Sequence, residues 1–155
     1  MISRHSYLEN DEPMLIAVYD SLRDDMSFNN KLETSYRVGD FISLPNFCLM
    51  DTGINEPILL NNFNMSVVME VYEVKKKILN ELDYYYGFFS SNLLHNDLNR
   101  NNRIEINTPY GRAYTYINNQ PINQGRVIPF GDWKDYLHYS SKMNIKKHEF
   151  KKTLK

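Results

Sequence analysis

The residues of this chain that could do chemistry do not form a known catalytic or metal-binding constellation. The four histidines lack metal-ligand spacing, and the chain contains no HExxH, GxGxxG or Walker sequence. Ser21 follows an apolar run, as in a nucleophile elbow, but its neighbours are Asp20 and Leu22, where that turn requires glycines. The single cysteine, Cys48, excludes an internal disulfide and a cysteine-based zinc site. The sequence therefore predicts neither a serine hydrolase nor a metal centre, and we expect no cofactor.

A dense aromatic block offers a different chemistry. It is formed by Tyr84, Tyr85, Tyr86, Phe88 and Phe89, and Asn and Arg residues follow it at 99–103. Aromatic faces beside polar groups can stack nucleobases, so a nucleotide-like ligand is one interpretation. The other interpretation is that the block fills the core at the end of a helix.

Composition and charge narrow the classes of partner. The 155 residues carry 18 basic and 19 acidic side chains, and a formal net charge of −1 argues against a dedicated nucleic-acid binder. No apolar run reaches the roughly 18 residues of a membrane span, and the N-terminus has no signal-peptide core, so we expect a cytoplasmic protein. Its many Tyr and Asn residues are compatible with an AT-rich genome, viral or otherwise.

The elements expected to position these residues are mixed. Apolar runs predict strands at 15–19, 47–50 and 66–74, separated by a polar loop or short helix at 22–32. Helical spacing predicts a helix that follows 74 and ends at Gly87, and a long loop should follow at 88–102. Alternation predicts a hairpin of 103–106 and 112–117, and a terminal helix should run through 136. Strands before and after a central helix favour an α+β domain with a strongly curved, mixed sheet.

Six segments in order resemble the γ-glutamylcyclotransferase-like family, which includes γ-glutamylamine cyclotransferases. They are VYDSLR at 18–23, the segment 38–59, VVMEVYEV at 67–74, LDYYYG at 82–87, AYTYI at 113–117 and IPFGDWKDYL at 128–137. The resemblance implies a small mixed β-barrel with flanking helices and a cavity at one end. It places this domain at 14–137, between a lead-in at 1–13 and a basic C-terminal helix or tail at 138–155.

The resemblance also implies a reaction. Active members convert a γ-glutamyl amide into 5-oxoproline and an amine, because the α-amino group of the substrate attacks its own γ-carbonyl. The enzyme supplies a glutamate, from an LDxxEG sequence, that moves protons, and backbone N–H groups of a VYGSLR loop that hold the substrate. Carried over to this chain, the ligand-binding residues are Tyr19, Asp20, Ser21, Leu22, Arg23 and Tyr86.

Both functional parts depart from the family pattern. Tyr86 stands at the glutamate position, and a phenol with an ordinary pKa near 10 is a poor proton acceptor at neutral pH. Asp20 replaces the loop glycine, either as a relocated base or as a side chain that bonds turn amides. We therefore expect a catalytically silent relative that binds a γ-glutamyl amide-like or nucleotide-like ligand, or a partner protein. The alternative is an active cyclotransferase that uses Asp20.

Overall fold

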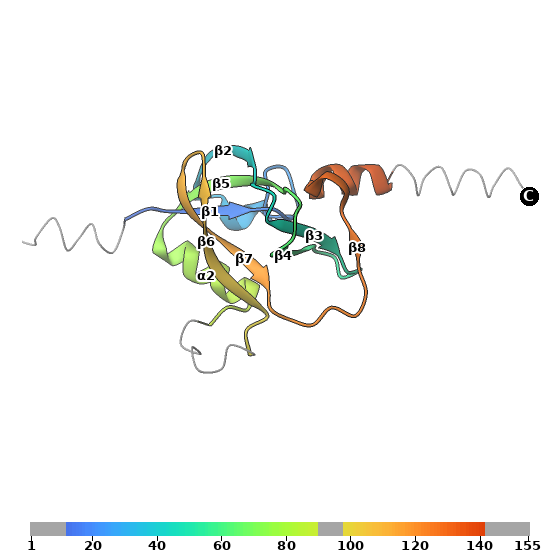
Figure 1. Cartoon of the computed structure of the whole chain (residues 1–155). Coiled ribbons are helices and arrows are strands. Elements are labelled where there is room, and N and C mark those ends of the chain that lie inside the picture. Colours follow the sequence, from blue (N-terminus) through green and yellow to red (C-terminus); the bar gives the residue numbers. More distant parts are fainter. Residues whose placement is uncertain (1–11, 90–97, 142–155) are drawn as a thin grey trace, which may run out of the picture.

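The computed structural model describes residues 12–89 and 98–141, which form two β-sheets, a central helix and a C-terminal helix (Figure 1). The strands are β1 Met14–Val18, β2 Tyr36–Ile42, β3 Phe47–Asp51, β4 Ile58–Asn61, β5 Val68–Val74, β6 Asn101–Thr108, β7 Gly111–Asn118 and β8 Arg126–Val127. The helices are α2, Lys76–Tyr86, and the short 3-10 helices η1, Asn29–Leu32, and η4, Pro129–Gly131. The described part of the C-terminal helix covers 133–141. Among the described residues, no helix is both long enough and apolar enough to span a membrane.

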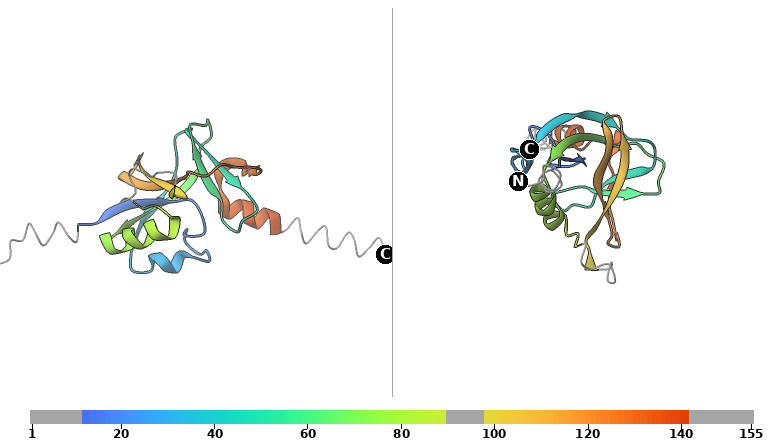
Figure 2. Two further views of the ribbon diagram at one scale, coloured as in Figure 1. Left: turned by 90° about the horizontal axis from the view of Figure 1, so that it is seen from below. Right: turned by 90° about the vertical axis from the view of Figure 1, so that its left-hand side faces the viewer.

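The larger sheet has the strand order β2-β5-β1-β7-β6, and the smaller has the order β4-β3-β8. Only the pairing of β1 with β7 is parallel, so the large sheet is mixed as expected. The large sheet curves strongly, and β4 of the small sheet lies against β7 (Figure 2). The mixed large sheet and the helices confirm the α+β class. β4 and β7 pack without forming a ladder, so the structure has two open sheets in place of the predicted barrel.

The central elements follow from local sequence pattern. β1 is the central strand of the large sheet, between β5 and β7, and its residues Ile16, Ala17 and Val18 are all buried in the hydrophobic core. In α2, one face buries Leu79, Leu82 and Tyr86, and the helix lies against β1 and β5. The helix ends at Gly87, which has the left-handed φ of 72° that glycine adopts without strain. The predicted helix, its cap and the 103–117 hairpin are thus confirmed.

Two strands have no clear signal in the sequence. β2 is half exposed and contains Gly39 and two charged residues, and its register with β5 shifts between Arg37 and Gly39. β4 has only four residues. The prediction of a loop over 88–102 is wrong at its end, because β6 begins at Asn101. The rest of that loop at 90–97, the lead-in at 1–11 and the basic segment from 142 lie outside the described residues.

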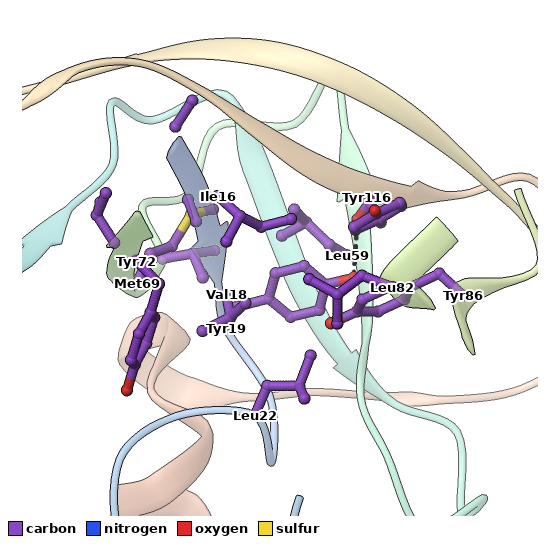
Figure 3. Packing of buried hydrophobic residues seen from close by; sticks show 14 of the residues in the cluster. Ile16, Val18, Tyr19, Leu22, Leu59, Met69, Tyr72, Leu82, Tyr86 and Tyr116 are labelled. Carbon is purple, nitrogen blue, oxygen red and sulfur yellow. Dashed lines mark hydrogen bonds between the residues drawn. The ribbon is translucent and has the colours of Figure 1, made fainter. Parts of the chain in front are cut away.

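The loop after β1 is built into the core. Leu22 is fully buried, and Figure 3 shows it below Tyr19 in the hydrophobic cluster. Backbone bonds fold the loop back on itself: Arg23 N donates to Asp20 O at 3.0 Å, and Phe28 N donates to Ser21 O at 2.9 Å. The loop backbone is therefore fixed directly beside the end of α2.

Candidate functional site

Asp20 and Tyr86 meet between the β1 loop and the last turn of α2. The Tyr86 hydroxyl donates a hydrogen bond to Asp20 Oδ2 at 2.5 Å, and Leu22 N donates to Asp20 Oδ1 at 3.1 Å. Asp20 is 2% exposed and Tyr86 is 6% exposed. Both carboxylate oxygens of Asp20 thus have partners inside the protein. Asp20 bonds a turn amide, as one of the two sequence interpretations expects, and also faces Tyr86.

Tyr86 packs against two further tyrosines, Tyr19 and Tyr116. The rings of Tyr86 and Tyr116 stack with centroids 4.1 Å apart, and the ring of Tyr19 lies 6.4 Å from that of Tyr86 (Figure 3). The Tyr19 hydroxyl donates to the Tyr116 carbonyl at 2.7 Å, and the Tyr116 hydroxyl donates to Asp83 Oδ1 at 2.6 Å. Arg103 Nη1 pairs with the other Asp83 oxygen at 2.5 Å. The end of α2 is therefore fixed to β6 and β7.

Ser21 binds a carboxylate that belongs to the chain itself. Ser21 N donates to Glu56 Oε1 at 3.0 Å, and Ser21 Oγ donates to Glu56 Oε2 at 2.6 Å. The indole Nε1–H of Trp133 donates to Ser21 Oγ at 3.1 Å and so orients this hydroxyl. Glu56 lies in the loop between β3 and β4. The backbone N–H groups of Ser21 and Leu22 are thus already bonded, to Glu56 and to Asp20 respectively.

Arg23 points to a different part of the protein. Its guanidinium Nε donates to Glu70 Oε2 at 2.8 Å and its Nη1 donates to Asp132 Oδ1 at 2.9 Å. Glu70 also accepts a hydrogen bond from Asp24 N at 2.7 Å. Arg23 therefore connects the loop to β5 and to the start of the C-terminal helix, and it does not line the cavity described next.

A cavity of about 290 Å³ opens beside the Asp20–Tyr86 pair. Of the six residues that the sequence assigned to ligand binding, Tyr19, Asp20 and Tyr86 line it, while Ser21 adjoins it through Glu56. The remaining lining residues are Thr52, Ile54, Asn55, Glu56, Pro57, Ile58, Tyr85, Arg100 and Asn101. Leu22 contributes its buried side chain to the core instead.

Burial sets the proton positions in the site. It raises the pKa of Asp20 to about 7, and the nearby charge of Glu56 adds to this effect, while the hydrogen bonds from Tyr86 and Leu22 oppose it. Burial and the neighbouring Asp20 hold the pKa of Tyr86 well above its ordinary value. Tyr86 therefore keeps its proton and acts as a hydrogen-bond donor. Asp20 is the group that can gain or lose a proton near neutral pH.

Sequence reasoning did not single out Glu56 or Trp133. Glu56 lies 35 residues from Ser21 and shows no motif spacing to it. Trp133 lies 112 residues away and was noted only as part of the segment at 128–137. In the described residues, no group of three or more His, Cys, Asp or Glu side chains could hold a metal ion.

These elements define a class of protein: an open α+β domain with a cavity between the loop after its first strand and the end of its central helix. The family model described as gamma-glutamyl cyclotransferase, AIG2-like, matches residues 16–135. The gamma-glutamylcyclotransferase family protein YtfP of Escherichia coli K12 is 31% identical over 125 residues, which cover 79% of this chain and 97% of that protein. This chain belongs to the γ-glutamyl cyclotransferase, AIG2-like family, as the six segments indicated.

Solved structures show the same fold. The solution structure of ytfP from Escherichia coli is 30% identical and has a TM-score of 0.60, and the match covers 77% of this chain and 96% of that one. An aig2-like protein from Mus musculus shares the fold at 18% identity, with a TM-score of 0.53 over 78% of this chain and 94% of that one. The chain thus spans nearly the whole length of these relatives.

Proposed function

We propose that this protein binds a small ligand in the cavity between the β1 loop and the end of α2 without cyclising it. One observation carries the proposal: a protonated phenol stands at the position that the resemblance assigns to the acid/base glutamate. The hydroxyl of Tyr86 donates to Asp20, so Tyr86 has no basic atom to take a proton from an ammonium group. The amides of Ser21 and Leu22 already bond the chain's own carboxylates.

The size of the cavity favours a compact ligand. A volume of about 290 Å³ is just below the usual range for ligand sites, which begins at roughly 300 Å³. A γ-glutamyl amide fits this space better than a nucleotide, although the tyrosines that line the cavity, Tyr19, Tyr85 and Tyr86, could also stack a base. A partner protein bound at the surface is the outcome to consider if neither kind of ligand binds.

The test measures release of 5-oxoproline from a panel of γ-glutamyl amines, alongside calorimetric titration of the same compounds. We expect binding to the wild-type protein with no release above the protein-free control. Asp20 would repel a carboxylate placed beside it. Restoring cyclotransferase activity therefore requires the double variant Asp20→Gly with Tyr86→Glu, which should gain turnover. Tyr86→Phe, which keeps the ring but cannot move protons, is the matched control.

A second candidate function is favoured by one observation. Asp20 lines the cavity and its pKa is raised to about 7, which suits a general base at neutral pH. If the wild-type protein releases 5-oxoproline and Asp20→Asn abolishes the release, then the protein is an enzyme with a relocated base. That result would contradict the binding proposal.

A further inference from the structure

We propose that Glu56 is an internal ligand of this cavity: its carboxylate occupies the Ser21 site in cis, and a ligand carboxylate binds there only by displacing it. This inference rests on the proposed function and names the ligand class of the site, a small carboxylate.

The contact of Glu56 with Ser21 has the form of a bound ligand. Both oxygens of one carboxylate are used, at 3.0 Å from Ser21 N and 2.6 Å from Ser21 Oγ. Trp133 Nε1 donates to Ser21 Oγ from a buried position, which leaves the hydroxyl hydrogen free to point at the carboxylate. Hydrogen bonds to an ionised acceptor are stronger than neutral ones, so the two donors of Ser21 suit a carboxylate.

Glu56 lies in a largely exposed loop, whose movement would take its carboxylate away from Ser21. The loop between β3 and β4 spans 52–57, and Gly53, Ile54 and Asn55 in its middle are exposed. Asn55 has a positive φ of 27°, a conformation that is strained for a residue with a side chain. Pro57, at the end of the loop, is buried and anchors it to β4. Movement of 53–56 would therefore free Ser21 without disturbing either sheet.

The cavity lies where an incoming ligand would meet this carboxylate. Glu56 and Asn55 line the cavity together with the aromatic side chains of Tyr19, Tyr85 and Tyr86. A ligand carboxylate bound to Ser21 would take the place of the Glu56 carboxylate. Asp20 would then still have one negative charge nearby, as it has when Glu56 is in place. A neutral ligand has no such exchange to make and would leave Glu56 in place.

The test uses Glu56→Ala with two probes, 5-oxoproline and its uncharged amide. Removing the competing carboxylate should raise the affinity for 5-oxoproline by about tenfold or more. In the wild-type protein the ligand must first break the one or two charge-assisted hydrogen bonds between Ser21 and Glu56, and in the variant these bonds are absent. The affinity for the amide should change by less than about threefold. Glu33→Ala, at an exposed carboxylate outside the cavity, should leave both affinities unchanged.

Hydrogen exchange gives a readout that does not depend on calorimetry. The Ser21 amide should exchange about tenfold faster in Glu56→Ala than in the wild-type protein, and added 5-oxoproline should restore its protection. The inference fails if the wild-type protein and Glu56→Ala bind 5-oxoproline equally, or if Ser21 protection does not change. If folded wild-type and variant proteins bind neither probe, then the proposed function fails as well.

Discussion

At the scale of single residues, Asp20 and Tyr86 place the carboxylate of the cavity on a different element from the one that the family pattern uses. The resemblance expects a glycine on the loop and a glutamate on the helix, and this chain has a carboxylate on the loop and a phenol on the helix. The Tyr86 hydroxyl and Asp20 Oδ2 lie 2.5 Å apart, so the cavity keeps a carboxylate, but that carboxylate comes from the loop and not from the helix. The Tyr86 ring occupies space that a shorter glutamate would leave open. A single change of Tyr86 to glutamate would nevertheless not restore the family arrangement, because Asp20 would remain beside the new carboxylate.

Asp20 should make the protein less stable as pH rises. Burial raises its pKa in the folded protein to about 7, from an ordinary value of 3.8. Between these values the folded protein keeps a proton that the unfolded chain has released, so stability is lost as pH rises through this window. The shift corresponds to at most about 4 kcal/mol.

Asp20→Asn should remove most of this pH dependence. Urea unfolding at several values between about pH 4 and pH 8 measures the free energy of unfolding of both proteins. The wild-type curve should fall over this range, and the Asp20→Asn curve should be flatter. Glu33→Gln, at an exposed carboxylate, should keep the wild-type slope. A wild-type curve without this fall would contradict the raised pKa.

At the scale of elements, the segment that leads into the C-terminal helix positions the loop after β1. Gly131 has a positive φ of 60°, and a Cβ atom there would collide with the backbone of Ser66 and Val67. The close approach of these two segments places Asp132 beside Arg23 and Trp133 beside Ser21. The glycine of the GDW sequence is therefore required for packing. It lets Asp132 and Trp133 reach the loop after β1, two residues of which, Tyr19 and Asp20, line the cavity.

Gly131→Ala should destabilise the protein more than Gly53→Ala does. Gly53 also has a positive φ, of 82°, but no atom lies within 4 Å of a Cβ placed there. Gly53→Ala therefore incurs only the conformational cost of about 1 kcal/mol, whereas Gly131→Ala adds a backbone collision. Thermal and urea unfolding measure the difference, which we expect to exceed about 2 kcal/mol in the free energy of unfolding. Equal losses would show that Ser66 and Val67 can move aside.

At the scale of the whole molecule, a buried ion network joins three distant parts of the chain. Arg23 in the loop, Glu70 in β5 and Asp132 before the C-terminal helix are paired at 2.8 and 2.9 Å. Arg37 of β2 and Lys134 of the C-terminal helix lie within 4 Å of Glu70. Burial raises the pKa of Glu70, but the hydrogen bond from Asp24 N, followed by Arg23 and Lys134, outweighs burial and holds this pKa below its ordinary value.

Glu70→Gln should cost about 3 kcal/mol or more in the free energy of unfolding, because it leaves the buried Arg23 without its closest carboxylate. The matched control is Glu105→Gln, which removes an exposed partner of Arg112 and should cost far less, because water screens an exposed ion pair. Urea unfolding of both variants at neutral pH makes the comparison. A cost for Glu70→Gln as small as that for Glu105→Gln would mean that water or Asp132 compensates Arg23 fully.

Sequence pattern predicts the elements whose stability is local or whose faces are apolar. β1, β5, α2 with Gly87, and the hairpin of β6 and β7 all follow from periodicity and turn residues. β2 and β4 were missed because their residues are partly exposed and owe their strand conformation to pairing with β5 and β3. β4 packs on β7 without pairing with it, so the two sheets are open where a barrel was expected.

The sequence by itself determined the chemical groups at the site: a phenol at Tyr86, a carboxylate at Asp20 and the order of segments that places the chain in its family. Only the tertiary structure decided what these groups do to one another. Burial gives Asp20 a pKa of about 7, and contacts across 35 to 112 residues of chain bring Glu56 and Trp133 to Ser21. Such contacts have no local signature, because they depend on how the loops and sheets pack.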